Sequence, residues 1–295
     1  MLNMAGETVG DIELKDEIFG IEINEFAVHE VIKNYLANQR QGMSCSIPTI
    51  SCSFAAAVSG PGVSFQLDVD FSICSQRAAF FGPSGSGKSL TLMALAGLLT
   101  PRQGKIEVRG KTFFNSESRI NVPARKRKTG FLFQDYALFP HLNVRDNVAF
   151  GLRPIFSPLP THSKKRVDEL LDLCGLTPLA GLRPHQISGG QRQRTALARA
   201  LAPGPELLLL DEPFTALDQP LRQRMRQEVF RILERFDIPT VLVSHDLEDI
   251  DHFAQSLIAF GGGRVLHVVD YAAQRAGKSA QDILNPLFQA AQRDI

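Results

Sequence analysis

The feature that most constrains the fold of this chain is a glycine-rich segment at residues 82–89. It reads Gly-Pro-Ser-Gly-Ser-Gly-Lys-Ser and fits the pattern G-x-x-x-x-G-K-[ST]. A short apolar run, 78–81, precedes the segment, and an apolar stretch without proline, 90–98, follows it. This order predicts a buried strand, a tight loop and a helix whose N-terminus faces an anion. The chain is therefore expected to bind a nucleoside triphosphate.

Each part of this loop has an expected task. The glycines let the backbone curl, so that successive N–H groups point inward at a phosphate. Lys88 is expected to reach the terminal phosphates, and the hydroxyl of Ser89 to bind Mg2+. The predicted phosphate-binding residues are Gly82, Pro83, Ser84, Gly85, Ser86, Gly87, Lys88 and Ser89.

Two adjacent carboxylates follow a run of four leucines, 207–210. The run predicts a strand buried on both faces, and its carboxyl end is where an open parallel sheet binds its ligand. Asp211 is predicted to hold Mg2+, usually through water. Glu212 is predicted to orient and deprotonate the water that attacks the γ-phosphate.

A second candidate anion site lies between these two segments. Residues 187–194 read Ile-Ser-Gly-Gly-Gln-Arg-Gln-Arg, and a plain helical sequence, 195–201, follows them. One chain needs only one loop for its triphosphate, so a second loop implies a second nucleotide contact.

These segments together resemble the ATP-binding cassette (ABC) family, whose signature Leu-Ser-Gly-Gly-Gln stands here with Ile187 in place of the leucine. The resemblance covers residues 44–268. It implies an α/β P-loop NTPase fold, with a mixed-sheet core and a helical subdomain. It also implies a head-to-tail dimer, in which the signature of one copy covers the γ-phosphate that Lys88 of the other copy binds. The signature residues expected at the nucleotide are Ser188, Gly189, Gly190 and Gln191.

The same resemblance assigns three further residues. Gln134 is expected to sense Mg2+ and the attacking water, and His245 to contact the γ-phosphate. The run 216–218 resembles the loop through which two cassettes contact each other. Asp218, in this run, is expected to contact the nucleotide. Cassettes also stack adenine on an aromatic side chain upstream of the lysine, and here only Phe54 and Phe65 stand at the edges of that stretch.

The sequence around Gln134 indicates which kind of ABC protein this is. Residues 134–152 resemble the entry to the helical subdomain of bacterial importers, where a groove receives a coupling helix from the membrane permease. Residues 183–186 stand where exporters carry a different insert. Residues 110–130 resemble the ATPases of molybdate importers most closely. The ATPases of sulfate, iron and polyamine importers share much of this sequence.

The first forty-two residues differ from the rest. They carry eight carboxylates against three cations, a net charge of −5, and a helical apolar pattern between Val28 and Leu36. Residues 5–42 resemble the N-terminus of bacterial large-subunit ribosomal protein L-four, without the basic loop that follows in that family. The expected organisation is a strand–helix leader at 1–42, an ABC ATPase domain at 43–268 with its helical subdomain at about 135–189, and a helical tail at 269–295.

Composition bears on partners and location. The 295 residues include 32 Lys plus Arg and 31 Asp plus Glu, so no overall field attracts nucleic acid or an anionic membrane. The N-terminus lacks the basic and apolar regions of a signal peptide. The basic run 125–128 is interpreted as a solvated loop, because it stands between Pro123 and Gly130.

The sequence thus predicts the ATP-hydrolysing subunit of a bacterial ABC importer for an oxyanion, with molybdate as the expected cargo. The alternative cargo is sulfate, iron or polyamine. The expected cofactors are ATP and Mg2+. The expected partners are a second copy, integral-membrane permease subunits and, indirectly, a substrate-binding protein, with no nucleic acid. The protein is expected at the cytoplasmic face of the inner membrane, held there by the permease. The alternative from another class is a permease-free cassette ATPase linked to translation.

Overall fold

A computed structural model describes residues 47–60, 63–153, 159–215, 219–275 and 282–283. The chain divides into two compact units, 1–44 and 45–295, and all described residues belong to the second. The predicted strand–helix leader lies outside the described residues. So do most of the predicted helical tail and the run 216–218.

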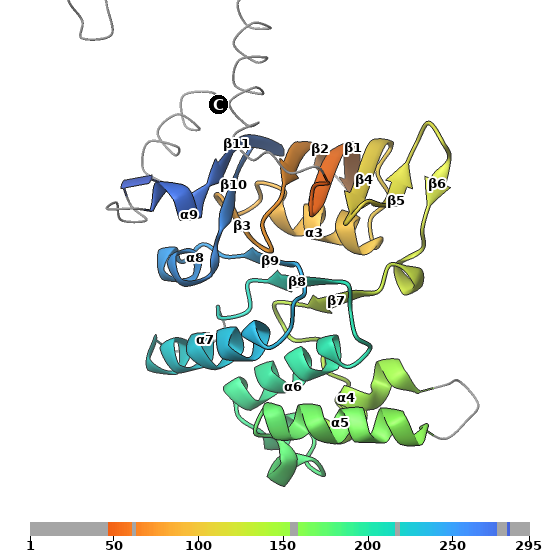
Figure 1. The fold of residues 1–295 in the computed structure, drawn as a ribbon, viewed down its shortest axis with the longest axis vertical. Helices are drawn as coiled ribbons and strands as arrows, with labels where there is room; N and C mark the ends of the chain where they lie inside the picture. The colour runs from red at the N-terminus through yellow and green to blue at the C-terminus, as the bar shows by residue number, and fades with distance from the viewer. Residues whose placement is uncertain (1–46, 61–62, 154–158, 216–218, 276–281, 284–295) are drawn as a thin grey trace, which may run out of the picture. The chain divides into compact units, whose positions relative to one another are not determined.

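In the described part of the chain, eleven strands form one mixed sheet in the order β6-β5-β4-β1-β2-β11-β10-β3-β9-β8-β7 (Figure 1). The strands are β1 (Ile50–Gly60), β2 (Val63–Ile73), β3 (Arg77–Phe81), β4 (Gln103–Val108), β5 (Lys111–Asn115), β6 (Ile120–Asn121), β7 (Thr129–Leu132), β8 (Leu207–Asp211), β9 (Thr240–Val243), β10 (Ser256–Gly261) and β11 (Arg264–Asp270). The half from β6 to β2 is antiparallel, whereas β10, β3, β9, β8 and β7 run parallel.

The described α-helices are α3 (Lys88–Ala96), α4 (Val144–Ala149), α5 (Thr161–Leu173), α6 (Gly189–Leu201), α7 (Gln219–Glu234), α8 (Leu247–Phe253) and α9 (Tyr271–Gln274). The helix predicted at 90–98 begins two residues earlier and ends at Ala96, because Gly97 adopts a left-handed conformation at φ +79°. At the other end of the domain, β11 extends to Asp270 and pairs with β10, two residues beyond the predicted boundary at 268.

The parallel half of the sheet is buried on both faces, as the leucine run predicts. In β8, Leu207 and Leu209 belong to the apolar cluster that includes α3, whereas Leu208 and Leu210 belong to the cluster that includes α6 and α7. Alternate side chains of a strand point to opposite faces, so a sheet covered on both sides needs a continuous apolar run.

The helical subdomain lies beyond α6. Helix α6 contacts β7 of the sheet and also α4, and α4 in turn contacts α5 (Figure 1). Helix α5 follows the amphipathic rule, since Val167, Leu170 and Leu171 are buried while its exposed positions include the charged residues Lys164, Lys165, Asp168, Glu169 and Asp172. Helices α4 and α5 fall within residues 135–189, the range predicted for a helical subdomain.

One residue of the basic run 125–128 corrects the sequence interpretation. Arg127 is only 1% exposed and is not part of a solvated loop. Its guanidinium donates to the carbonyl oxygens of Ala94 and Leu95 at 2.7 and 3.0 Å, and to that of Val122 at 2.7 Å. A Cβ built on Gly97 would lie 2.7 Å from Arg127 Nε, so the glycine leaves room for it. Arg127 therefore caps the C-terminal end of the helix that follows the phosphate loop.

We expect Arg127→Met to lower the free energy of unfolding by about 3 kcal/mol, because several buried carbonyl oxygens lose their donor at once. Chemical denaturation followed by circular dichroism measures this change. The neighbouring Lys126 is exposed, and Lys126→Met is its matched control, with an expected change within about 0.5 kcal/mol. Equal effects of the two substitutions would contradict the capping role.

Candidate nucleotide-binding site

Four segments of the predicted site meet at one edge of the sheet. Strands β3, β9, β8 and β7 are parallel, so the segments that follow their carboxyl ends lie side by side. These segments are the loop 82–89 after β3, Gln134 after β7, Asp211 and Glu212 at the end of β8, and His245 after β9.

The loop 82–89 has the curled backbone that its glycines predict. Gly85 and Gly87 have φ values of +78° and +101°, in the left-handed region that favours glycine. A Cβ built on Gly87 would lie 2.5 Å from Leu67 Cδ1, and the left-handed backbone at this position is strained for any residue with a side chain. Helix α3 begins directly after it at Lys88, and its first N–H groups face the loop.

Lys88 is buried at the centre of the loop. Its Nζ donates to the carbonyl oxygens of Gly82 and Pro83 at 2.9 and 2.7 Å, and to Ser86 Oγ at 3.3 Å. Burial lowers the pKa of this ammonium, and the carboxylates of Glu212 and Asp211 oppose that shift. The amine is thus held where it can bind phosphate oxygens, and the two carboxylates favour its charged form.

Ser89 and Asp211 form the predicted metal-binding pair. The Ser89 hydroxyl donates to Asp211 Oδ1 at 2.8 Å across 122 positions of sequence. Burial raises the pKa of Asp211, and the Ser89 hydrogen bond and Lys88 act against this shift. Two oxygen ligands beside a phosphate site suit Mg2+, which commonly takes one or two carboxylates plus phosphate and water oxygens.

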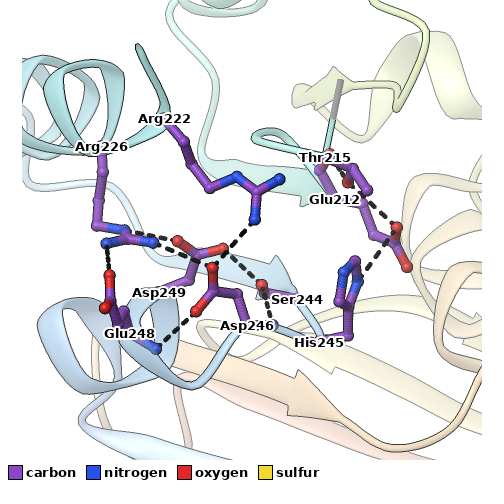
Figure 2. A network of polar contacts seen from close by, with 9 residues as sticks. All are labelled: Glu212, Thr215, Arg222, Arg226, Ser244, His245, Asp246, Glu248 and Asp249. Carbon is purple, nitrogen blue, oxygen red and sulfur yellow. Dashed lines mark hydrogen bonds and ion pairs between the residues drawn. The ribbon is translucent and has the colours of Figure 1, made fainter. Parts of the chain in front are cut away.

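The Glu212 carboxylate lies among three polar groups. Its Oε2 accepts from Thr215 Oγ1 at 3.2 Å and from Gln134 Nε2 at 3.4 Å, and it lies 3.6 Å from His245 Nδ1. Figure 2 shows Glu212, Thr215 and His245 turned toward one another. The Glu212 backbone is left-handed, at φ +44°, and its N–H donates to the carbonyl oxygen of Val243 at 3.0 Å. Such backbone strain is typical of functional sites.

A half-buried arginine fixes the backbone that follows Gln134. Tyr136 and Ala137 have φ values of +64° and +42°, which are unfavourable for residues with a Cβ. Arg199, on α6, donates to their carbonyl oxygens at 2.7 and 2.6 Å. The residue therefore ties the loop after Gln134 to the helix that begins at the signature.

The signature residues form the N-terminus of α6. Ser188 is its N-cap: Ser188 Oγ accepts from the N–H of Gln191 at 3.3 Å, and Gln191 Oε1 accepts from the N–H of Ser188 at 2.8 Å. A Cβ built on Gly190 would lie 2.8 Å from Met225 Sδ on α7, so glycine lets the two helices pack. The structure thus forms the predicted second helix N-terminus.

A cavity of about 430 Å³ is lined by the phosphate loop, Gln134 and Glu212. No signature residue lines it within one copy of the described chain. Of the two candidate aromatics, Phe54 is buried in the core around β1, whereas the half-buried Phe65, on β2, lines this cavity. The predicted contact at Asp218 lies outside the described residues.

Comparison with known proteins decides the family. The profile described as ABC transporter matches residues 67–215, which span the phosphate loop, the signature and both carboxylates. The chain belongs to the ABC transporter family. In fold, the cassette is similar to the ATP-binding cassette MJ0796, solved as a dimer in a post-hydrolysis state with ADP and Pi. That similarity has a TM-score of 0.61 at 27% identity, covering 75% of this chain and 98% of the other.

Two curated relatives are importer components. The cassette is 46% identical over 190 residues to the sulfate/thiosulfate import ATP-binding protein CysA of Synechocystis sp., covering 64% of this chain and 52% of that protein. It is 45% identical over 192 residues to the Fe(3+) ions import ATP-binding protein FbpC 2 of Pectobacterium atrosepticum, covering 65% and 54%. The cassette thus spans about half the length of these relatives. In its described residues, no helix is both long and apolar enough to cross a bilayer.

The family and fold confirm that the chain carries an ABC-type ATPase domain. The structure adds residues of this cassette that sequence reasoning missed. Thr215 was missed because no motif names it, although it follows Glu212 by three positions and so can bend back to it. In the sequence, Arg199 and Arg226 look like ordinary cations of two helices. Only the structure shows that Arg199 donates to backbone carbonyl oxygens and that Arg226 pairs with carboxylates.

Proposed function

We propose that the cassette binds ATP and Mg2+ and hydrolyses ATP as a head-to-tail dimer that powers a bacterial importer. The observation that carries this proposal is the convergence of Lys88, Ser89, Gln134 and Glu212 at one cavity. Asp211 is joined to this cavity by its hydrogen bond with Ser89. The signature lies at a separate helix N-terminus. A second copy would therefore supply the signature's N–H groups to the γ-phosphate, as the dimeric state of the similar cassette MJ0796 suggests.

In this proposal each side chain has a separate task. The loop N–H groups and Lys88 bind the phosphates, and Ser89 with Asp211 would hold Mg2+, which neutralises phosphate charge when bound. Glu212 accepts a proton from the attacking water, while Gln134 and Thr215 orient its carboxylate. His245 is 56% exposed at its side chain, so it is free to reach a γ-phosphate in the cavity.

The importer assignment rests on the relatives and on the surface of the helical subdomain. Both relatives are named as import ATP-binding proteins. Phe150, 48% exposed, directly follows α4, and its ring packs against that of Phe139 with centroids 4.1 Å apart. Phe139 stands five positions after Gln134. We propose this aromatic pair as part of the permease-docking groove, and we propose that the permease holds the cassette at the cytoplasmic face of the inner membrane. A substrate-binding protein would deliver the cargo to the permease.

The cargo we propose is a small inorganic ion. Residues 110–130 favour molybdate, whereas the two relatives are named for sulfate/thiosulfate and Fe(3+), so these ions are the alternatives to test. The experiment compares uptake of labelled molybdate, sulfate and Fe(3+) in cells with and without the gene, and with a plasmid that restores it. The ion whose uptake is lost on deletion and restored by the plasmid is the cargo. Uptake of all three unchanged by deletion would contradict an importer of inorganic ions.

We further expect Phe65 to contact the base of the nucleotide. Replacing it with alanine should weaken ATP binding by about tenfold, because stacking on an aromatic ring contributes about 1–3 kcal/mol per base. Binding of tripolyphosphate, which has no base, should not change. The affinities are measured by titration calorimetry, with Phe150→Ala as the matched control. Equal weakening for ATP and tripolyphosphate would mean that Phe65 only supports the loop beside Gly87.

A further inference from the structure

A buried ion pair lies behind the exposed His245. Arg226 on α7 and Asp249 on α8 are 3% and 2% exposed, and Arg226 Nε lies 2.6 Å from Asp249 Oδ1. The same guanidinium reaches Glu248 Oε2 at 2.7 Å and Asp246 Oδ2 at 3.3 Å (Figure 2). Neither Arg226 nor Asp249 lines the nucleotide cavity.

The pair is connected to both neighbours of His245. The Ser244 hydroxyl donates to Asp249 Oδ2 at 2.6 Å, and the backbone N–H of Asp246 donates to Ser244 Oγ at 3.0 Å. In Figure 2 these contacts form a continuous path from Arg226 to the turn that carries His245. The backbone is thus held on either side of a histidine whose own side chain is largely exposed.

Stability alone is a weak reason for such a pair. Removing two charges from water is costly, and replacing a buried ion pair by apolar side chains of similar volume is often neutral or stabilising. An ion pair does, however, fix orientation, because a guanidinium offers donors in a rigid planar fork. Here three carboxylates take separate positions around that fork, and one of them accepts from Ser244.

We infer that Arg226 and Asp249 are positioning residues that, through Ser244 and Asp246, hold His245 beside Glu212 for ATP hydrolysis. The inference rests on the proposed hydrolysis. The inference goes beyond the proposed hydrolysis because it gives α7 and α8 a part in setting the geometry of the γ-phosphate contact. Small displacements of a contact group can cost about 100-fold in rate, so the loss of this support should act on kcat and leave ATP binding in place.

The test separates positioning from folding by removing the pair in two ways. Arg226→Met leaves Asp249 buried and unpaired, so both the melting temperature and kcat should fall, kcat by at least about tenfold. The double variant R226M/D249L buries no unpaired charge and should recover the melting temperature while kcat stays low. ATP affinity should stay within about threefold throughout. Recovery of kcat together with the melting temperature would show that the pair only supports the fold.

Ser244→Ala tests the connection itself, because it keeps the ion pair and removes the hydroxyl between Asp249 and Asp246. We expect kcat to fall by about tenfold with little change in melting temperature. Glu228→Gln is the matched control: it breaks an ion pair of the same helix that is directed at Arg194 on α6, and kcat should stay within about twofold.

Hydrogen–deuterium exchange of the full chain supplies a readout that does not depend on hydrolysis. Peptides that contain 244–246 should exchange faster in S244A and in R226M/D249L than in the wild type, and those of the phosphate loop should not change. Unchanged exchange at 244–246 would overturn the inference. A wild-type chain without ATPase activity would instead overturn the proposed function, and the exchange result would still decide whether the network holds this turn.

Discussion

Glu212→Gln is expected to lower kcat for ATP hydrolysis by about 100- to 10,000-fold while ATP binding is retained, since general-base contributions fall in this range. Glutamine keeps the size of the side chain and its contacts with Thr215 and Gln134, but its amide cannot accept a proton from water. Phosphate release measures kcat, and titration with ATP measures binding. Because bound ATP would no longer be consumed, the variant should also accumulate as a nucleotide-bound dimer in size-exclusion chromatography.

The matched control for this substitution is Glu206→Gln. Glu206 pairs with Lys111 and Lys128 at the protein surface, at the opposite end of β8 from Glu212, and its loss should leave kcat within about twofold. A Glu212→Gln variant that hydrolyses ATP at the wild-type rate would remove Glu212 from its role as the base. A variant that no longer binds ATP would show instead that the carboxylate acts on the phosphate loop.

Lys88→Ala should weaken ATP binding by on the order of 100-fold, because a buried, charge-assisted contact with the phosphates is lost. The carbonyl oxygens of Gly82 and Pro83 lose their donor at the same time, so the empty loop also becomes less ordered. Titration calorimetry at fixed ionic strength measures the affinity, and thermal unfolding checks that the fold persists.

Lys165→Met is the control for charge alone, because Lys165 is exposed on α5 and its loss should change ATP affinity by less than about twofold. If Lys88→Ala and Lys165→Met weakened binding equally, the effect would come from net charge, and Lys88 would have no special contact with the phosphates.

The parts of the site set by local sequence were predictable. The pattern at 82–89 predicts its own loop, and the leucine run 207–210 predicts a strand covered on both faces, which the structure forms as β8. The resemblance to ABC cassettes assigned Gln134 and His245 to the same site as Glu212. The parallel strands explain why the three lie close together, because the carboxyl ends of these strands meet at one edge of the sheet.

The parts that depend on distant partners were not predictable. Arg127 looks like one more surface cation in a basic run, and its burial follows from α3 carbonyl oxygens more than thirty positions away. Strand β1 contains three successive alanines, which have low strand propensity, yet it pairs along its whole length with β2. Tertiary partners override local preference in both cases.

The most direct test of the account is phosphate release from a mixture of two inactive variants, Lys88→Ala and Ser188→Arg. Each alone should be inactive, and Ser188→Arg should still bind ATP through its intact phosphate loop. Mixed, they form dimers in which one site joins an intact Lys88 to an intact Ser188, so activity should return to about a quarter of the wild-type value at most. No recovery on mixing, from a wild type that hydrolyses ATP, would contradict a site shared between two copies.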